Sequence, residues 1–136
     1  MVHIQYEDTE ILDLDPEFFV SWLSKVCSDE GKVLMAVSLV FCSDDYLLGV
    51  NRKFLNHDYY TDIITFDYVE GINISGDLLI SIDRVRDNAS REKVSLKQEL
   101  DRVVVHGVLH LLGYKDKSKS EEQLMRSKED YYLGFT

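Results

Sequence analysis

Proline and cysteine are scarce in this sequence, with one proline and two cysteines among 136 residues. Cys27 and Cys42 lie in different predicted elements and form no Cys-x-x-Cys pair, so we expect two reduced, buried thiols and no disulfide framework. One proline and 45% hydrophobic residues favour a single compact domain over residues 1–136, with enough apolar material for one core. No internal repeat or low-complexity segment interrupts it.

Long hydrophobic runs are also missing. The longest, Val33 to Cys42, is interrupted by Ser38 and is about half the length needed to cross a bilayer. The first ten residues are acidic and lack a charged region followed by an apolar one, which excludes a signal peptide. We therefore expect a soluble, cytoplasmic protein with no membrane partner.

Positively charged residues are also scarce. The sequence has 15 Lys and Arg and 25 Asp and Glu, which gives a net charge of −10. This balance argues against nucleic-acid binding, which rests largely on the neutralisation of phosphates. The charge is uneven, however, because residues 84–128 carry eleven Lys and Arg against seven Asp and Glu. These basic residues form either a solvated surface of ion pairs or a positive rim with modest RNA affinity and a shallow salt dependence.

The most informative stretch present is Leu96 to Asp116, which places His106 and His110 four residues apart in an apolar run. Three consecutive valines would suit a strand, but imidazoles four residues apart on a strand are about 13 Å apart and cannot share an ion. On a helix they lie one turn apart and can converge. Ser95 with Gln98 forms a capping box and Gly113 a C-terminal stop, so we predict a buried helix.

Asp116 is the third candidate metal ligand of this stretch. Two imidazoles and a carboxylate, with a fourth position left to water, are the ligand set of a catalytic zinc site, here one zinc ion per chain. Gly107 occupies the position where zinc proteases of the His-Glu-x-x-His type carry their general base, which argues against peptide hydrolysis. The same ligand types also form the facial triad of non-haem iron oxygenases.

The other predicted elements point to an α+β fold with a mixed sheet of about four strands and about five helices, one of them the central histidine helix. The helix capped by Ser43 is expected to direct Tyr46, Leu47, Val50 and Phe54 inward. In chain order, the expected elements are a strand at 2–6, a helix capped by Asp15, a buried strand at 34–41, a helix capped by Ser43, a hairpin of strands at 63–68 and 77–82, a helix at 83–93 capped by Asp83, the histidine helix, and a last helix capped by Ser118 or Ser120.

Three blocks of the sequence resemble a known family. Residues 106–114, HGVLHLLGY, resemble the HGxLHLxGYDH signature of the YbeY family of bacterial metal-dependent endoribonucleases. Residues 51–66, NRKFLNHDYYTDIITF, are similar to the family's N-x-x-Y-R followed by T-D-V-L-S-F, and residues 76–81, GDLLIS, to its G-D-I-x-I-S. The chain departs from the pattern at Asp116, where the family has a third histidine, and at Leu55, where it has an arginine.

This resemblance implies a single-strand-specific metallo-endoribonuclease that matures the 3′ end of small-subunit ribosomal RNA and takes part in ribosome quality control. Its partners would be single-stranded ribosomal RNA and the small ribosomal subunit. The nucleophile would be a metal-activated water or the 2′-hydroxyl of the substrate. The alternative is a ribosome-associated assembly factor with a mainly structural metal, which Leu55 and the acidic body of the chain favour.

Five further residues are candidates for the site. Asp62 and Asp77 lie in the matching blocks and could accept hydrogen bonds from imidazole N–H groups, or could equally cap turns. Arg102, Lys115 and Lys117 flank the histidines and are candidates for RNA contact, although a salt bridge is the alternative for Arg102. Because Asp116 donates more negative charge than an imidazole, we expect a higher pKa of the bound water and a more alkaline optimum.

Overall fold

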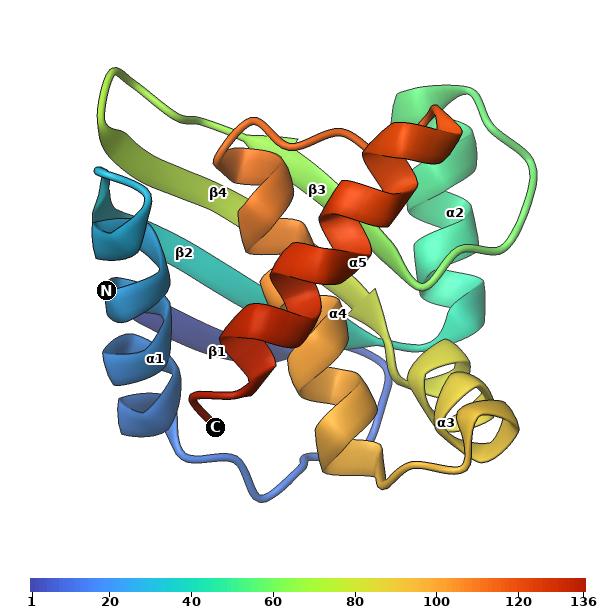
Figure 1. Ribbon diagram of the computed structural model, residues 1–136. Coiled ribbons are helices and arrows are strands. Elements are labelled where there is room, and N and C mark those ends of the chain that lie inside the picture. The colour runs from blue at the N-terminus through green and yellow to red at the C-terminus, as the bar shows by residue number, and fades with distance from the viewer.

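The structure, a computed structural model, describes all residues from Met1 to Thr136. In chain order the elements are β1 (Val2–Tyr6), α1 (Pro16–Asp29), β2 (Val33–Cys42), α2 (Asp44–Leu55), β3 (Ile63–Asp67), β4 (Asn73–Ser81), α3 (Ile82–Glu92), α4 (Leu96–Leu111) and α5 (Lys119–Leu133) (Figure 1). The predicted α+β class, with four strands and five helices, is confirmed. No helix has the combination of length and apolar character that crossing a bilayer requires.

The four strands form one mixed sheet in the order β1-β2-β4-β3. β1 pairs parallel to β2 and β2 parallel to β4, whereas β3 runs antiparallel to β4 and completes the predicted hairpin. The expectation that the second strand is buried on both faces is wrong for its first half. Val33 and Met35 are 46% and 48% exposed, and continuous burial begins only at Leu39, since the helices cover that end of β2.

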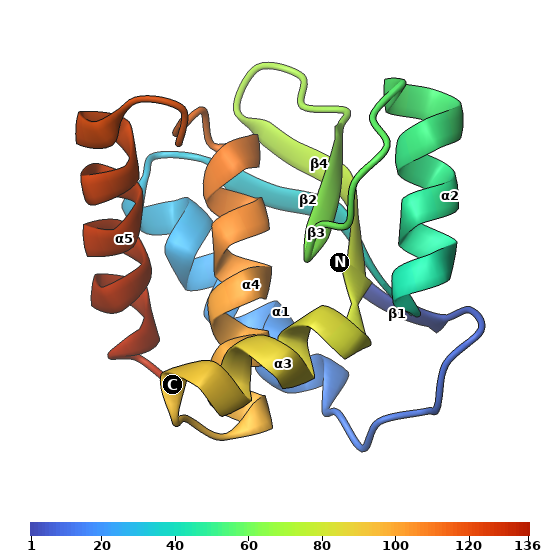
Figure 2. The ribbon, with the colours of Figure 1, turned by 90° about the vertical axis from the view of Figure 1, so that its right-hand side faces the viewer.

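Helices cover both faces of the sheet, with α1, α4 and α5 on one side and α2 on the other (Figure 2). The main core of 23 buried residues lies on the side of α1, α4 and α5. A smaller cluster of Cys42, Leu47 and Ile64 lies under α2. Both cysteines are buried and free, as predicted.

The predicted inward face of α2 is wrong for two of its residues. Tyr46 and Phe54 are 36% and 62% exposed, and Leu48 and Asn51 are buried beside Leu47 instead. The buried face of α2 therefore differs from the predicted one. It includes Asn51, a polar residue that the sequence pattern assigns to the surface. Its amide donates to the carbonyl of Tyr59 at 2.9 Å and so ties the loop after α2 to the helix.

The histidine helix α4 begins and ends where its sequence signals predict. The Ser95 hydroxyl accepts from the Gln98 backbone N–H and the Gln98 side chain accepts from that of Ser95, which forms the expected capping box. After the helix, Gly113 takes a φ of 101°, a left-handed conformation that favours glycine. On the sheet side, a Cβ at Gly107 would lie 2.7 Å from Ile63 Cδ1, so glycine lets α4 pack closely against β3 and β4.

Hydrogen bonds show which residues cap α3 and α5. α3 begins after Ser81 and not after Asp83, because the Ser81 hydroxyl accepts from the Arg84 backbone N–H. The Asp83 carboxylate accepts from the backbone N–H of Asp44 at the start of α2. Of the two predicted caps of the last helix, Ser118 is used, in a capping box with Glu121.

Candidate metal centre

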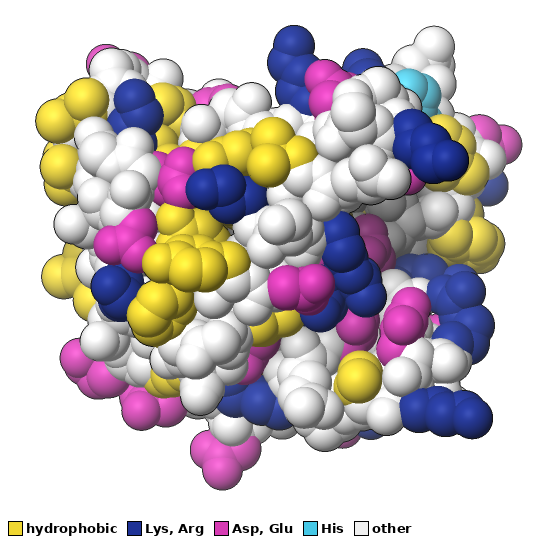
Figure 3. Space-filling view, viewed as in Figure 1, with side chains coloured by type: hydrophobic (Ala, Val, Ile, Leu, Met, Phe, Trp, Pro, Cys, Tyr) yellow, Lys and Arg dark blue, Asp and Glu magenta, His cyan; other side chains and the backbone are white.

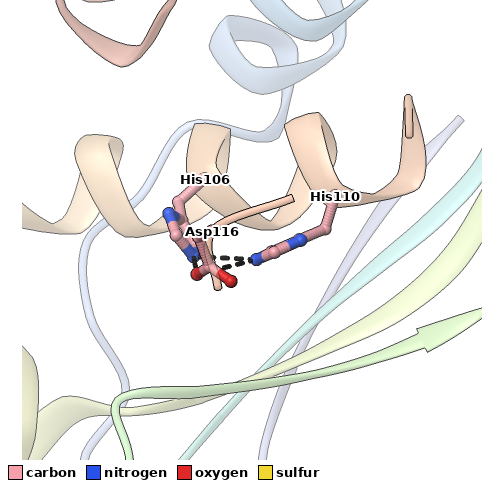
Figure 4. A group of neighbouring side chains, drawn as sticks. All are labelled: His106, His110 and Asp116. Atoms are coloured by element: carbon pink, nitrogen blue, oxygen red, sulfur yellow. Dashed lines mark hydrogen bonds and ion pairs between the residues drawn. The ribbon is translucent and has the colours of Figure 1, made fainter. Parts of the chain in front are cut away.

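His106, His110 and Asp116 come together at the C-terminal half of α4 (Figure 4). The two histidine Nε2 atoms are 3.1 Å apart. Oδ2 of Asp116 lies 3.3 Å from Nε2 of His106 and 3.2 Å from Nε2 of His110. In no other place do three His, Cys, Asp or Glu side chains converge in this way.

The triangle of these three atoms has the size that a zinc ion requires. Zinc binds nitrogen at about 2.0–2.1 Å, so two ligand atoms of a tetrahedral site lie roughly 3.3–3.4 Å apart. The edges of 3.1 to 3.3 Å agree with this spacing. The chain returns to the helix because Gly113 reverses its direction and the Tyr114 N–H donates to the carbonyl of Leu109 at 3.0 Å, which brings Asp116 over α4.

Each imidazole is oriented through its other nitrogen. Nδ1 of His106 lies 2.7 Å from Oε2 of Glu129, and Nδ1 of His110 lies 3.0 Å from the carbonyl oxygen of Tyr114. Both contacts use Nδ1 as the donor and leave the Nε2 lone pairs directed at one point, the arrangement typical of metal-bound histidines. Burial acts to lower the pKa of His106, but the hydrogen bond and charge of Glu129 outweigh it and raise that pKa.

Glu129 is itself held by a cation. Its side chain is 6% exposed, and its Oε1 accepts from Nη1 of Arg102 at 2.9 Å. The second guanidinium nitrogen donates to Asp130 at 2.7 Å. Arg102 therefore forms the salt bridges that were the alternative to RNA contact, and its role is to fix the carboxylate behind His106.

The structure separates the remaining predicted site residues. Asp62 lies beside His106 in the adjoining cleft, and Asp77 accepts a hydrogen bond from the Tyr68 hydroxyl at 3.2 Å, but neither bonds to an imidazole. Glu129 and the Tyr114 carbonyl take the places that were predicted for these aspartates. Lys115 and Lys117 flank Asp116 and are exposed, with no ion pair. Leu55 ends α2 and is 40% exposed.

A cleft of about 580 Å³ adjoins the centre and is bordered by α3, α4 and α5. Figure 3 shows the hollow beside α5, with acidic side chains inside it and Lys and Arg on its rim. Burial raises the pKa of Asp62 in this cleft, against the opposing positive charge of His106. The lining side chains are Asp62, Asn88, Glu92, Glu99, Arg102, Val103, His106, Asp116, Lys119, Glu122, Gln123, Met125, Arg126 and Glu129.

Sequence reasoning missed Glu129, which lies 23 residues after His106 in a different helix. One signal was available. Met125, Glu129 and Tyr132 are spaced three and four residues apart and form the buried face of α5, so a carboxylate interrupts an otherwise apolar stripe. A buried carboxylate on such a face requires a partner, and the nearest predicted site with N–H donors was the pair of histidines.

A second polar cluster supports the segment that holds His110. Glu30, which caps the end of α1, accepts a hydrogen bond from the Tyr114 hydroxyl at 2.6 Å and another from the Tyr132 hydroxyl. Nζ of Lys128 lies 3.4 Å from the same carboxylate. The cluster ties α1 to α5 and to the connection whose carbonyl orients His110.

Replacing Glu30 with glutamine is expected to lower the free energy of unfolding by about 1–2 kcal/mol at neutral pH, because the charge and one of the two acceptor oxygens are lost. Burial acts to raise the pKa of Glu30, but the bonds from Tyr114 and Tyr132 and the charge of Lys128 lower it overall. A lowered folded-state pKa stabilises the protein above the unfolded-state value and loses this contribution as the pH falls through the folded-state value.

Urea unfolding between pH 7 and pH 3 measures this effect. The gap between wild type and Glu30→Gln is expected to be constant above about pH 5 and to shrink below it. Glu7→Gln, at an exposed position, is the matched control and should track the wild type. A gap that stays constant down to pH 3 would show that the charge of Glu30 does not stabilise the fold.

Comparison with known proteins identifies the family of this chain. The sequence profile described as "Endoribonuclease YbeY" matches residues 3–135. Proteins named endoribonuclease YbeY from Flavobacterium psychrophilum and Cytophaga hutchinsonii are 50% and 54% identical, over 98% and 84% of this chain and 94% and 80% of their own lengths. The solution structure of TM1509 from Thermotoga maritima has 26% identity and a TM-score of 0.67 over 98% of this chain and 87% of its own. The chain belongs to the YbeY endoribonuclease family.

Proposed function

We propose that this protein is a metal-dependent endoribonuclease that cleaves single-stranded RNA, with one zinc ion per chain held by His106, His110 and Asp116. The observation that carries the proposal is the triangle of two Nε2 atoms and one carboxylate oxygen with edges of 3.1 to 3.3 Å. Relatives about half identical to the chain bear the name endoribonuclease, which supports phosphodiester cleavage as the reaction.

The chain's own residues prepare this site. Glu129 accepts a hydrogen bond from Nδ1–H of His106, and the Tyr114 carbonyl accepts one from Nδ1–H of His110, so both rings keep one tautomer and one orientation. Arg102 neutralises Glu129 and prevents an unpaired charge behind the ligand. When bound, a divalent ion supplies Lewis-acid stabilisation of phosphoryl charge and lowers the pKa of a water molecule. The adjoining cleft has room for a nucleotide next to these groups.

We further propose that the substrate is ribosomal RNA, that the protein matures the 3′ end of small-subunit RNA and contributes to ribosome quality control, and that it acts in the cytoplasm. Lys115 and Lys117 are exposed and flank Asp116, which supports their proposed contact with RNA phosphates. The net charge of −10 gives the rest of the surface little attraction for RNA. Targeting by the small ribosomal subunit would supply the affinity that the chain lacks.

A second candidate function is ribosome assembly with a mainly structural metal and little nuclease activity. Leu55 favours this function, because the N-x-x-Y-R motif has an arginine at this position and leucine supplies no positive charge. The two candidates differ in what holds the fold. A structural metal is part of the folding free energy, whereas a catalytic metal can be removed from a folded protein.

Metal removal tests the proposal. The protein as purified is expected to cleave a labelled single-stranded RNA, to lose that activity on chelation, and to regain it with one equivalent of zinc. Circular dichroism and thermal melting of the chelated protein should show a retained fold, because the main core of 23 residues includes neither histidine. A zinc-loaded protein that cleaves no RNA, and unfolds on chelation, would instead support the assembly-factor function.

A further inference from the structure

Glu99 is a buried carboxylate without a partner. It is 7% exposed, and no hydrogen bond or ion pair reaches its side chain. Its position in the first turn of α4 suits a negative charge. Its own backbone N–H donates to the carbonyl oxygen of Ser95 and does not reach the carboxylate. No side-chain oxygen or nitrogen in the protein is fully enclosed without a partner, so this carboxylate reaches solvent. Glu99 lines the cleft beside the metal centre and also a smaller neighbouring pocket of about 280 Å³.

The nearby cations do not satisfy Glu99. Arg102 already donates to Glu129 and Asp130, and Arg126 lies 4.0 Å from Glu129. Burial raises the pKa of Glu99, Arg102 opposes this shift, and the charge of Asp62 adds to it. Within the protein no donor meets the Glu99 carboxylate, so only water bonds to it, and a ligand with N–H donors can replace that water.

The geometry of the cleft favours an organic donor over a second metal ion. Glu99 shares the cleft with Asp62, Glu92 and Glu122, but no three of these carboxylates converge on one point as the ligands of the metal centre do. An ion would therefore find no more than two of these carboxylates at one point. A planar molecule with N–H groups along one edge can instead reach Glu99 from within the cleft.

Among the nucleobases, guanine presents such an edge. Its N1–H and N2–H groups point the same way and match the two oxygens of a carboxylate in a bidentate pair. The corresponding edges of adenine and cytosine carry one amino donor beside a ring-nitrogen acceptor, which a carboxylate repels. Uracil offers a single N–H between two carbonyls.

We propose that Glu99 is the specificity-determining residue of a guanine site next to the metal centre, which rests on the proposed RNA-cleaving function. Glu99 lies seven residues before His106 on α4, two helical turns or about 10 Å along the axis. Both residues line the same cleft, so an RNA strand whose phosphate lies at the metal centre places a neighbouring base near Glu99.

The walls of the cleft suit a flat ring. Its volume of about 580 Å³ is within the usual range of roughly 300–1,000 Å³ for small-ligand sites. Val103 and Met125 are the two apolar side chains in its lining, and Arg126, 54% exposed, offers a guanidinium plane for stacking. Single-stranded RNA is the form that can present an unpaired base edge, in agreement with the proposed substrate.

Binding without cleavage tests this site separately from the nuclease activity. The zinc-loaded protein is titrated with labelled five-nucleotide 2′-O-methyl RNAs of sequence UUGUU, UUAUU, UUCUU and UUUUU, each checked by gel to be intact afterwards. Wild type is expected to bind the guanine-containing strand about tenfold or more tightly than the others, since a bidentate pair discriminates by about that factor. Glu99→Gln should lose this preference, and Glu7→Gln, the same charge change at an exposed position outside the cleft, should keep it.

Each outcome has a distinct meaning. Equal binding of the four strands by wild type, or a guanine preference that survives in Glu99→Gln, would overturn the guanine site. Uniformly tighter binding of all four strands by Glu99→Gln would show that Glu99 only repels phosphates, which would also overturn it. Failure of the protein to cleave any RNA would instead count against the proposed function and leave the binding result intact.

Discussion

His110→Ala is expected to abolish RNA cleavage while the protein remains folded. His110 supplies one of the three converging ligand atoms, and its ring is partly exposed at the end of α4, outside the buried core. Loss of a hydrogen-bond partner behind a metal ligand already costs about 10–100-fold in affinity or activity, so loss of the ligand itself should cost at least about a hundredfold. Metal analysis of the purified variant and cleavage of a labelled RNA measure both effects.

Two other variants sharpen this result. His3→Ala removes an exposed histidine on β1 and should leave metal content and cleavage unchanged. Glu129→Gln keeps the three ligands but removes the carboxylate behind His106, and it should fall between wild type and His110→Ala. A His110→Ala protein that retains a full equivalent of metal and normal cleavage would remove this triangle from the proposed mechanism.

Gly76→Ala is expected to cause the largest loss of stability from a single methyl group. A Cβ at Gly76 in β4 would lie 2.6 Å from the backbone oxygen of Phe66 in β3 and 2.8 Å from Cδ2 of Leu111 at the end of α4. The backbone oxygen cannot move without disturbing the β3–β4 pairing. We expect the free energy of unfolding to fall by about 2–3 kcal/mol, the range typical of overpacked cores.

Gly49→Ala is the matched control for this substitution. Gly49 is exposed in the middle of α2, and an added Cβ there meets no atom within 4 Å. Alanine should therefore stabilise the protein by up to about 1 kcal/mol, because glycine is a poor helix former. Urea unfolding of both variants gives the comparison, and a Gly76→Ala protein as stable as wild type would show that β3 can shift away from β4 at little cost.

The features of the fold that the sequence predicted correctly depend on residues close together in the chain. The caps of α4 and α5 and the glycine after α4 depend on residues a few positions apart, and β3 pairs with the next strand along the chain, β4. The convergence of His106 and His110 follows from helical spacing alone. Asp116 could be predicted as a neighbour because the stop at Gly113 leaves only a short connection.

The parts that sequence did not predict depend on which elements meet. Glu129 reaches His106 because α5 packs against α4, and Asp62 reaches the same cleft from the start of β3. The inward face of α2 was misplaced because Asn51 is buried by a hydrogen bond to a loop, which outweighs its polarity. These contacts depend on how the helices and strands pack together, so local sequence patterns do not predict them.

The bond between Trp22 and α5 bears on when the centre is assembled during synthesis. Nε1 of Trp22 in α1 donates to the carbonyl of Tyr132 at 3.0 Å, across 110 residues of chain. The ligands leave the ribosome before α5, which carries Glu129 and also closes over α1. A nascent chain can thus pair its strands and form α4 while the ring of His106 is still free to turn. We therefore expect the proposed centre to hold an ion firmly only once the last helix has docked, which would delay metal capture until the surrounding structure is in place.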